Sequence, residues 1–147
     1  MDCYLSGDWM ESENADEHYT EELVRLPHSG LRYPRHHFEV SKRATREEFG
    51  LSNEGPLILM GQNLLKCVPR WDELFAEVSE TVNAPIVVVS RERALVEAIL
   101  KTRFEKARIR STWLSRLNPK EFQDLVGLAD VSLDPPAWSG GNTTIEA

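Results

Sequence analysis

The amino-acid sequence predicts an α/β fold, in which a Rossmann-like parallel sheet with flanking helices follows a less regular N-terminal segment. Three observations lead to this prediction. After residue 56, short apolar runs alternate with helical patterns of ten or more residues, which is typical of βαβ units. The run 57–60 is continuously apolar, as expected for a strand buried on both faces. Before residue 56 apolar runs are scarce. We therefore expect two regions, 1–55 and 56–147.

The first region is expected to contain only short elements. Residues 2–5 favour a short strand. Residues 14–24 are expected to form a helix, because Asn14 or Asp16 can cap it and acidic residues fill its first turn. A loop with at most one short strand should follow over residues 30–42.

A helical turn is expected at the end of this region, over residues 45–49. Thr45 and Glu48 have the spacing of a capping box. Gly50 follows directly and can end the turn in a left-handed conformation.

The second region predicts alternating strands and helices. The predicted strands are 57–60, 85–89, 108–111 and 130–134, and the predicted helices are 71–82, 91–107 and 119–128. The third helix has Asn118 as its cap and Pro119 at its first position. Helical spacing assigns to the core Trp71, Leu74, Phe75 and Val78 of the first helix, and Leu95, Val96, Ile99 and Leu100 of the second.

Ligands of parallel α/β sheets bind beyond the carboxyl ends of the strands. This rule points to three loops, 61–69, 112–118 and 135–144. Lys66 lies in the first loop, where it could neutralise a diphosphate, although a loop lysine is usually just solvated. The sequence contains neither a Walker motif nor the Gly-x-Gly-x-x-Gly fingerprint of dinucleotide sites.

The third loop contains two consecutive glycines and runs into the start of a helix. Such a turn can bind an anion through backbone N–H groups, and Thr143 and Thr144 add hydroxyl donors. Glu146 could accept hydrogen bonds from ribose hydroxyls. The alternative is an ordinary strand-to-helix turn in which Asn142 or Thr143 caps the helix.

Charge and composition limit the possible functions. The net charge of −7 argues against sequence-independent binding to nucleic acid and against binding to an anionic membrane. No apolar run is long enough to span a membrane, and no signal peptide is visible. Cys3 and Cys67 form no disulfide framework, so we expect a reducing, cytoplasmic location. The adjacent pair His36–His37 has no ligand spacing around it, so no metal site is expected.

A series of motifs runs along the chain. They are Gln-Asn-Leu-Leu-Lys at 62–66, Pro69, Trp-Asp at 71–72, Arg-Ile at 108–109, Leu-Ala-Asp-Val-Ser-Leu-Asp at 128–134 and Ser-Gly-Gly-Asn-Thr-Thr-Ile-Glu-Ala at 139–147. In order and approximate spacing they resemble the C-terminal catalytic lobe of O-linked N-acetylglucosamine transferases, in particular the bacterial SPINDLY-like branch, whose lobes often follow tetratricopeptide repeats. Residues 2–8 and 18–27 resemble the end of the family's N-terminal lobe.

The resemblance implies a GT-B arrangement of two Rossmann-like lobes, with residues 56–147 forming part of the C-terminal lobe. It implies an inverting transfer of N-acetylglucosamine from UDP-N-acetylglucosamine to Ser or Thr of a protein acceptor. Enzymes of this family need no metal ion, because a lysine and a helix N-terminus offset the charge of the diphosphate. The implied partners are therefore a nucleotide sugar and a protein.

The motifs also imply the residues that bind UDP. Lys66 matches the lysine that contacts the diphosphate. The turn at the phosphates is matched by Gly141, Asn142 and Thr143. Gly141 stands where histidine is common and Asn142 where threonine is common, so backbone N–H groups would carry more of the binding here.

The resemblance also implies the contacts to the nucleoside. Leu117 would offer a backbone contact to uracil. Phe122 matches a position near the base where better-known members carry a histidine, and Glu146 matches the ribose-binding carboxylate. The catalytic residues stay unassigned, because those of the N-terminal lobe would precede Met1.

Two hypotheses follow. In the first, the chain is a fragment of a UDP-sugar-dependent glycosyltransferase, since the family continues beyond Ala147 with at least two more βα units. In the second, it is a non-catalytic α/β module, either a nucleotide-binding remnant or a protein-interaction domain.

The resemblance predicts that the isolated 147-residue chain transfers no sugar. Positioning of the acceptor can account for about 7–11 kcal/mol of barrier lowering, and a two-lobe enzyme positions its acceptor in the cleft between lobes. The measurement is incubation with labelled UDP-N-acetylglucosamine and a protein acceptor. Label transfer above that of a Lys66→Ala control would contradict this prediction.

Overall fold

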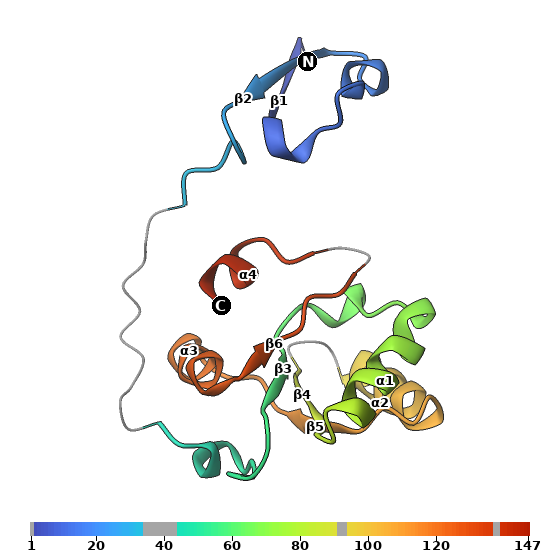
Figure 1. Ribbon diagram of the computed structural model, residues 1–147, viewed down its shortest axis with the longest axis vertical. Coiled ribbons are helices and arrows are strands. Elements are labelled where there is room, and N and C mark those ends of the chain that lie inside the picture. Colours follow the sequence, from blue (N-terminus) through green and yellow to red (C-terminus); the bar gives the residue numbers. More distant parts are fainter. Residues whose placement is uncertain (1, 34–43, 91–93, 137–138) are drawn as a thin grey trace. The chain divides into compact units, whose positions relative to one another are not determined.

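The structure, a computed structural model, describes residues 2–33, 44–90, 94–136 and 139–147. It contains two compact units, Met1–His37 and Phe38–Ala147, and Figure 1 labels their elements. Residues 44–55 thus belong to the same compact unit as the large sheet.

The first unit is built on two parallel strands, β1 (Cys3–Gly7) and β2 (Glu22–Leu26), with Cys3 opposite Glu22. Two short 3-10 helices lie between them, η1 (Asp8–Met10) and η2 (Ala15–His18). The strand expected near the N-terminus is present, with its bounds shifted to Cys3–Gly7.

The helix predicted over residues 14–24 is wrong. Only Ala15–His18 forms a helical turn, and Asn14 makes no side-chain cap bond to it. The second half of the predicted helix is strand β2, in which Val24 lies opposite Leu5 of β1. Pairing with a strand that is remote in sequence outweighs the local helical pattern.

The second unit contains a four-stranded parallel sheet, which confirms the predicted fold class. The strand order is β5-β4-β3-β6, and every neighbouring pair is parallel. The strands are β3 (Ile58–Met60), β4 (Ile86–Val89), β5 (Ser111–Leu114) and β6 (Val131–Ser132). The helices are α1 (Asp72–Thr81), α2 (Ala94–Lys106), α3 (Pro119–Leu128) and α4 (Asn142–Glu146), with 3-10 turns η3 (Arg46–Phe49), η4 (Leu64–Lys66) and η5 (Pro69–Trp71).

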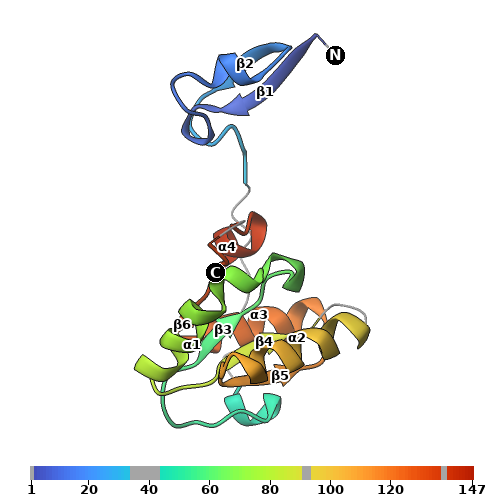
Figure 2. The ribbon, with the colours of Figure 1, turned by 90° about the vertical axis from the view of Figure 1, so that its right-hand side faces the viewer.

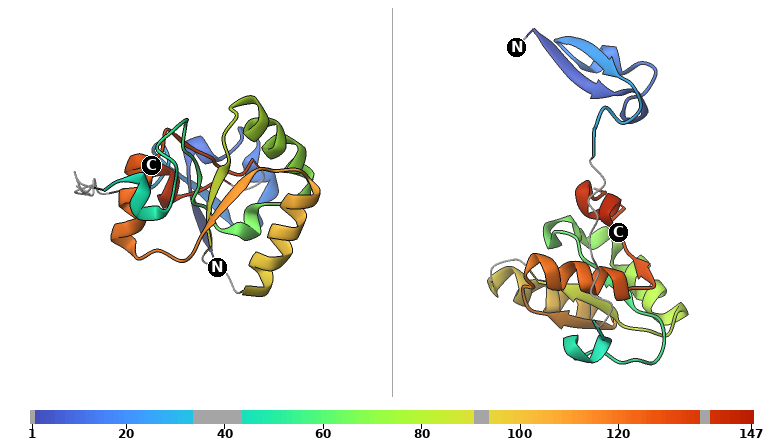
Figure 3. Two further views of the ribbon diagram at one scale, coloured as in Figure 1. Left: turned by 90° about the horizontal axis from the view of Figure 1, so that it is seen from below. Right: turned by 90° about the vertical axis from the view of Figure 1, so that its left-hand side faces the viewer.

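Alternate strand residues supply a hydrophobic layer on each face of this sheet. One layer contains Ile58, Met60, Ile86 and Val88 of the strands with Phe75, Leu100 and Phe104 of α1 and α2. The other contains Leu59, Val87 and Val89 with Phe122 and Leu125 of α3. Figures 2 and 3 show the sheet between α1 and α2 on one side and α3 on the other. Burial on both faces explains the continuous apolar runs of β3 and β4.

Two details of the predicted strands need correction. The third strand does not begin at Arg108, whose φ of 58° instead lets its N–H donate to the Glu105 carbonyl at the end of α2. Strand β5 starts three residues later, at Ser111. The fourth strand is shorter than expected and covers only Val131–Ser132.

Part of the predicted core is exposed. On α2, Leu95 and Ile99 are 72% and 59% exposed, whereas Leu100 and Phe104 are buried. On α1, Leu74 is 39% exposed. Helix α2 carries apolar residues on both its sides, so its periodicity alone could not select the face that packs on the sheet.

The turn η3 is confirmed with its caps. Thr45 and Glu48 form both bonds of the capping box, and Gly50 ends the turn with a φ of 67°. Helix α3 likewise has the predicted Asn118 cap, which accepts a hydrogen bond from the Glu121 N–H at 2.9 Å.

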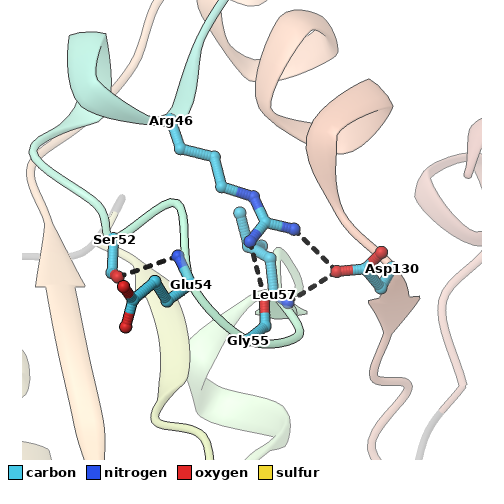
Figure 4. A network of polar contacts seen from close by, with 6 residues as sticks. All are labelled: Arg46, Ser52, Glu54, Gly55, Leu57 and Asp130. Atoms are coloured by element: carbon cyan, nitrogen blue, oxygen red, sulfur yellow. Dashed lines mark hydrogen bonds and ion pairs between the residues drawn. The ribbon is translucent and has the colours of Figure 1, made fainter.

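A polar network at the amino end of the sheet joins η3 to the strands (Figure 4). Arg46 donates to the Gly55 carbonyl and to Asp130 Oδ2, both at 2.7 Å. The Leu57 N–H donates to the same Asp130 oxygen at 2.8 Å. The Leu57 N–H and the Arg46 guanidinium together lower the pKa of Asp130 from its usual value.

We predict that Asp130→Asn destabilises the second unit at neutral pH and that this effect fades in acid. A carboxyl whose pKa is lowered by folding stabilises the protein above its unfolded pKa, about 3.9, and the contribution is lost as pH falls through the folded pKa. Urea unfolding of wild type and variant at several pH values measures it. The exposed Asp8→Asn serves as control, and a difference in stability that is independent of pH would contradict the prediction.

Candidate functional site

The order of the strands places a switch point between β3 and β6. After β3 the chain adds β4 and β5 on one side, then crosses back to add β6 on the other side of β3. Connections that leave two such strands diverge to opposite faces and open a crevice at the carboxyl ends. The loop that follows β3 and the segment that follows β6 therefore form the candidate site.

The loop after β3 is hydrogen-bonded to the turn after β6. Lys66 Nζ, at the end of η4, donates to the Ser139 carbonyl at 3.0 Å. The amide of Gln62, which is 5% exposed, donates to Thr144 Oγ1 at 3.2 Å. These contacts join segments that are more than seventy residues apart in sequence.

Asp134 organises the turn from the β6 side. Its Oδ1 accepts a hydrogen bond from the Gly140 N–H at 2.7 Å. Its Oδ2 accepts from the hydroxyls of Ser139 and Thr144. One carboxylate thereby binds three donors of the turn, so the turn is held against the sheet edge before any ligand arrives.

A cavity of about 550 Å³ lies beside this turn. Its size is within the usual range for small-molecule sites. The residues that line it are Arg116, Leu117, Asn118, Pro119, Phe122, Gln123 and Thr143. Three of them, Leu117, Phe122 and Thr143, are residues that the sequence motifs assign to UDP.

Phe122 forms part of the cavity wall although it is only 7% exposed. It belongs to the hydrophobic layer on the α3 face. Its ring packs against the backbone of Gly61, where an added Cβ would lie 2.8 Å from Phe122 Cζ. The glycine that follows β3 thus makes room for the ring beside the crevice.

Three other predicted residues, Lys66, Gly141 and Asn142, are not among the residues that line the cavity. Lys66 is half-buried and bonded to the Ser139 carbonyl. Gly141 and Asn142 are exposed at the start of α4. Gly141 occupies the N-cap position, where either Asn142 or Thr143 was expected. Glu146 is the last residue of α4, and its side chain lies outside the part of the chain that the structure describes.

Helix α4 has only five residues. Its macrodipole is therefore small and would offset little of the charge of a bound anion. None of the hydrogen bonds found among the described residues uses the N–H of Asn142 or Thr143. Both amides lie in the first turn of α4, where N–H groups lack helical partners.

Among the residues of the site that sequence reasoning missed are Gln62, Asp134 and Arg116. All three lie at or beside the loops that the sheet rule selects, so the signal was available. Gln62 follows the glycine after β3, and Asp134 follows β6. Their polar side chains were not distinguished from ordinary loop residues, because only the fold brings them to the same turn.

No group of three His, Cys, Asp or Glu side chains suited to a metal ion occurs in the part of the chain that the structure describes. His36 and His37 lie outside that part. Among the described helices none is both long and apolar enough to cross a membrane.

No protein-family model matches the chain, and a search of curated proteins finds no match.

We predict that Gly61→Ala disturbs the cavity through Phe122. The new methyl group would overlap the ring edge and force it to move, at a cost of about 1–3 kcal/mol. The free energy of unfolding is measured in urea for Gly61→Ala, for Phe122→Leu and for the double variant. Gly61→Ala should lower the free energy of unfolding much less in the Phe122→Leu background than in the wild type. Equal decreases in both backgrounds would contradict the proposed contact.

Proposed function

We propose that this chain is part of an inverting protein O-glycosyltransferase and contributes to the lobe that binds the nucleotide sugar. The donor is UDP-N-acetylglucosamine, the acceptor is Ser or Thr of a protein, and no metal ion takes part. We also infer a cytoplasmic location, in line with the two unpaired cysteines.

One observation carries the proposal. The resemblance assigned Leu117, Phe122 and Thr143 to the nucleotide, and these residues of two separate segments line one cavity. That cavity lies beside the switch point of a parallel sheet, where nucleotides bind in doubly wound folds. Leu117 and Phe122 form an apolar wall suited to a flat base, and Thr143 offers a hydroxyl on the side of the turn.

Lys66 supplies the positive charge that a diphosphate needs. Its ammonium is close enough to the turn to bond the Ser139 carbonyl. A diphosphate bound at the turn would attract the ammonium more strongly than that neutral carbonyl does, because opposite charges attract each other directly. We therefore expect Lys66 to exchange the carbonyl for the diphosphate when UDP binds.

The exposed side of α2 favours a second candidate function, a protein-interaction module without catalysis. Leu95 and Ile99 lie one helical turn apart and are largely exposed. Single exposed apolar residues are common, so this observation is weaker than the cavity.

The first test measures the binding of UDP to the 147-residue chain by isothermal titration calorimetry or by amide chemical shifts. Lys66→Ala should weaken UDP binding by about tenfold or more, because a lysine–diphosphate pair contributes on the order of 1–3 kcal/mol. Binding of uridine, which has no phosphate, should not change.

Lys106→Ala is the matched control. It removes the same charge from an exposed lysine at the end of α2, and it should leave UDP affinity unchanged. Equal UDP affinities for wild type and Lys66→Ala would reject the assignment of Lys66. Absence of any UDP binding by the wild type would reject the proposed function.

A further inference from the structure

Thr144 lies where the two sides of the crevice meet. Its Oγ1 accepts a hydrogen bond from Gln62 Nε2 at 3.2 Å and donates to Asp134 Oδ2 at 3.2 Å. Gln62 follows β3 and Asp134 follows β6, so one hydroxyl connects the ends of two paired strands. A hydroxyl has a single proton to donate, and that of Thr144 is already used inside the protein.

The turn is closely packed at the same point. A Cβ added to Gly140 would lie 2.1 Å from Gln62 Nε2 and 2.2 Å from Thr144 Oγ1. The Gly140 N–H is itself bonded to Asp134. Gly140 therefore leaves the space through which Gln62 reaches Thr144, and any side chain there would separate them.

The position of Thr144 determines where Thr143 points. Successive residues of a helix are rotated by about 100° about its axis, so a helix held with Thr144 toward Asp134 presents Thr143 in another direction. Thr143 lines the cavity, and Thr144 is absent from its lining. The two adjacent threonines thus have different surroundings.

We propose that Thr144 and Asp134 are positioning residues, which hold the turn so that Thr143 faces the nucleotide while they make no contact with it. Gln62 completes the arrangement from the β3 side. This inference rests on the proposed function, since UDP is the ligand whose binding it explains.

The test compares two substitutions of Thr144 in the 147-residue chain, with UDP as the probe. Thr144→Val keeps the shape and removes the hydroxyl, whereas Thr144→Ser keeps the hydroxyl. We expect Thr144→Val to weaken UDP binding roughly tenfold, because the turn is no longer pre-organised. Thr144→Ser should stay within about twofold of the wild type. The Gly140 amide resonance should move in Thr144→Val and not in Thr144→Ser.

Gln62→Met is the second variant, since methionine has a similar length and no amide to donate. It should also weaken UDP binding. If Thr144→Val does not fold, Gln62→Met tests the positioning role in its place. Wild-type affinity in Thr144→Val, or in Gln62→Met, would overturn the positioning role and leave the proposed function intact. A wild-type chain that binds no UDP would overturn both. Equal weakening of UDP binding in Thr144→Ser and Thr144→Val would show that the hydroxyl does not carry the effect and would overturn the proposal.

Discussion

The parallel pairing of β3 with β6 is the constraint on which the rest of the second unit depends. Because β6 returns to the far side of β3, the sheet acquires a switch point, and the loops after both strands meet at its carboxyl edge. The pairing itself is short, as β6 has only two residues. Side chains at both ends of β6 therefore supply hydrogen bonds in place of those that a longer strand ladder would form.

Two aspartates that flank β6 do this in different ways. Asp130, before the strand, accepts a hydrogen bond from the Leu57 N–H and forms an ion pair with Arg46. It thereby joins β6 to β3 at the amino edge. Asp134, after the strand, accepts three donors of the turn at the carboxyl edge. The first carboxylate secures the strand pairing, and the second shapes the segment beside the cavity. Both act as acceptors of backbone N–H groups, which is how short strands and turns satisfy their polar atoms.

The candidate site divides into an apolar part and a charged part. Leu117 and Phe122 form the apolar part, and Phe122 is at the same time a core residue of the α3 face. Lys66 supplies the charge from the opposite loop. Under the proposed function, the apolar part would face the base of the nucleotide and Lys66 its diphosphate. This division also links stability to binding, because any change in the packing of Phe122 against Gly61 alters the cavity wall.

Local patterns in the sequence determined the sheet and its parallel connections. The apolar runs of β3 and β4 and the caps of η3 and α3 are local signals, read within a few residues. The same signals located the loops at the carboxyl edge. They failed for β2, whose pairing partner lies in β1, and for the outer side of α2, where Leu95 and Ile99 match the apolar period without reaching the core.

Only the tertiary structure decided how the site is assembled. Gln62, Asp134 and Thr144 carry no pattern that links them, and their hydrogen bonds span up to eighty-two residues of sequence. Their convergence follows from the order of the strands, because β6 can bring its turn to the β3 loop only by pairing on the free side of β3. Periodicity and capping motifs depend on residues that are close together in the sequence, so they determined most helices and strands of the second unit. The pairing of distant strands, which buries a shared core, decided which side chains meet.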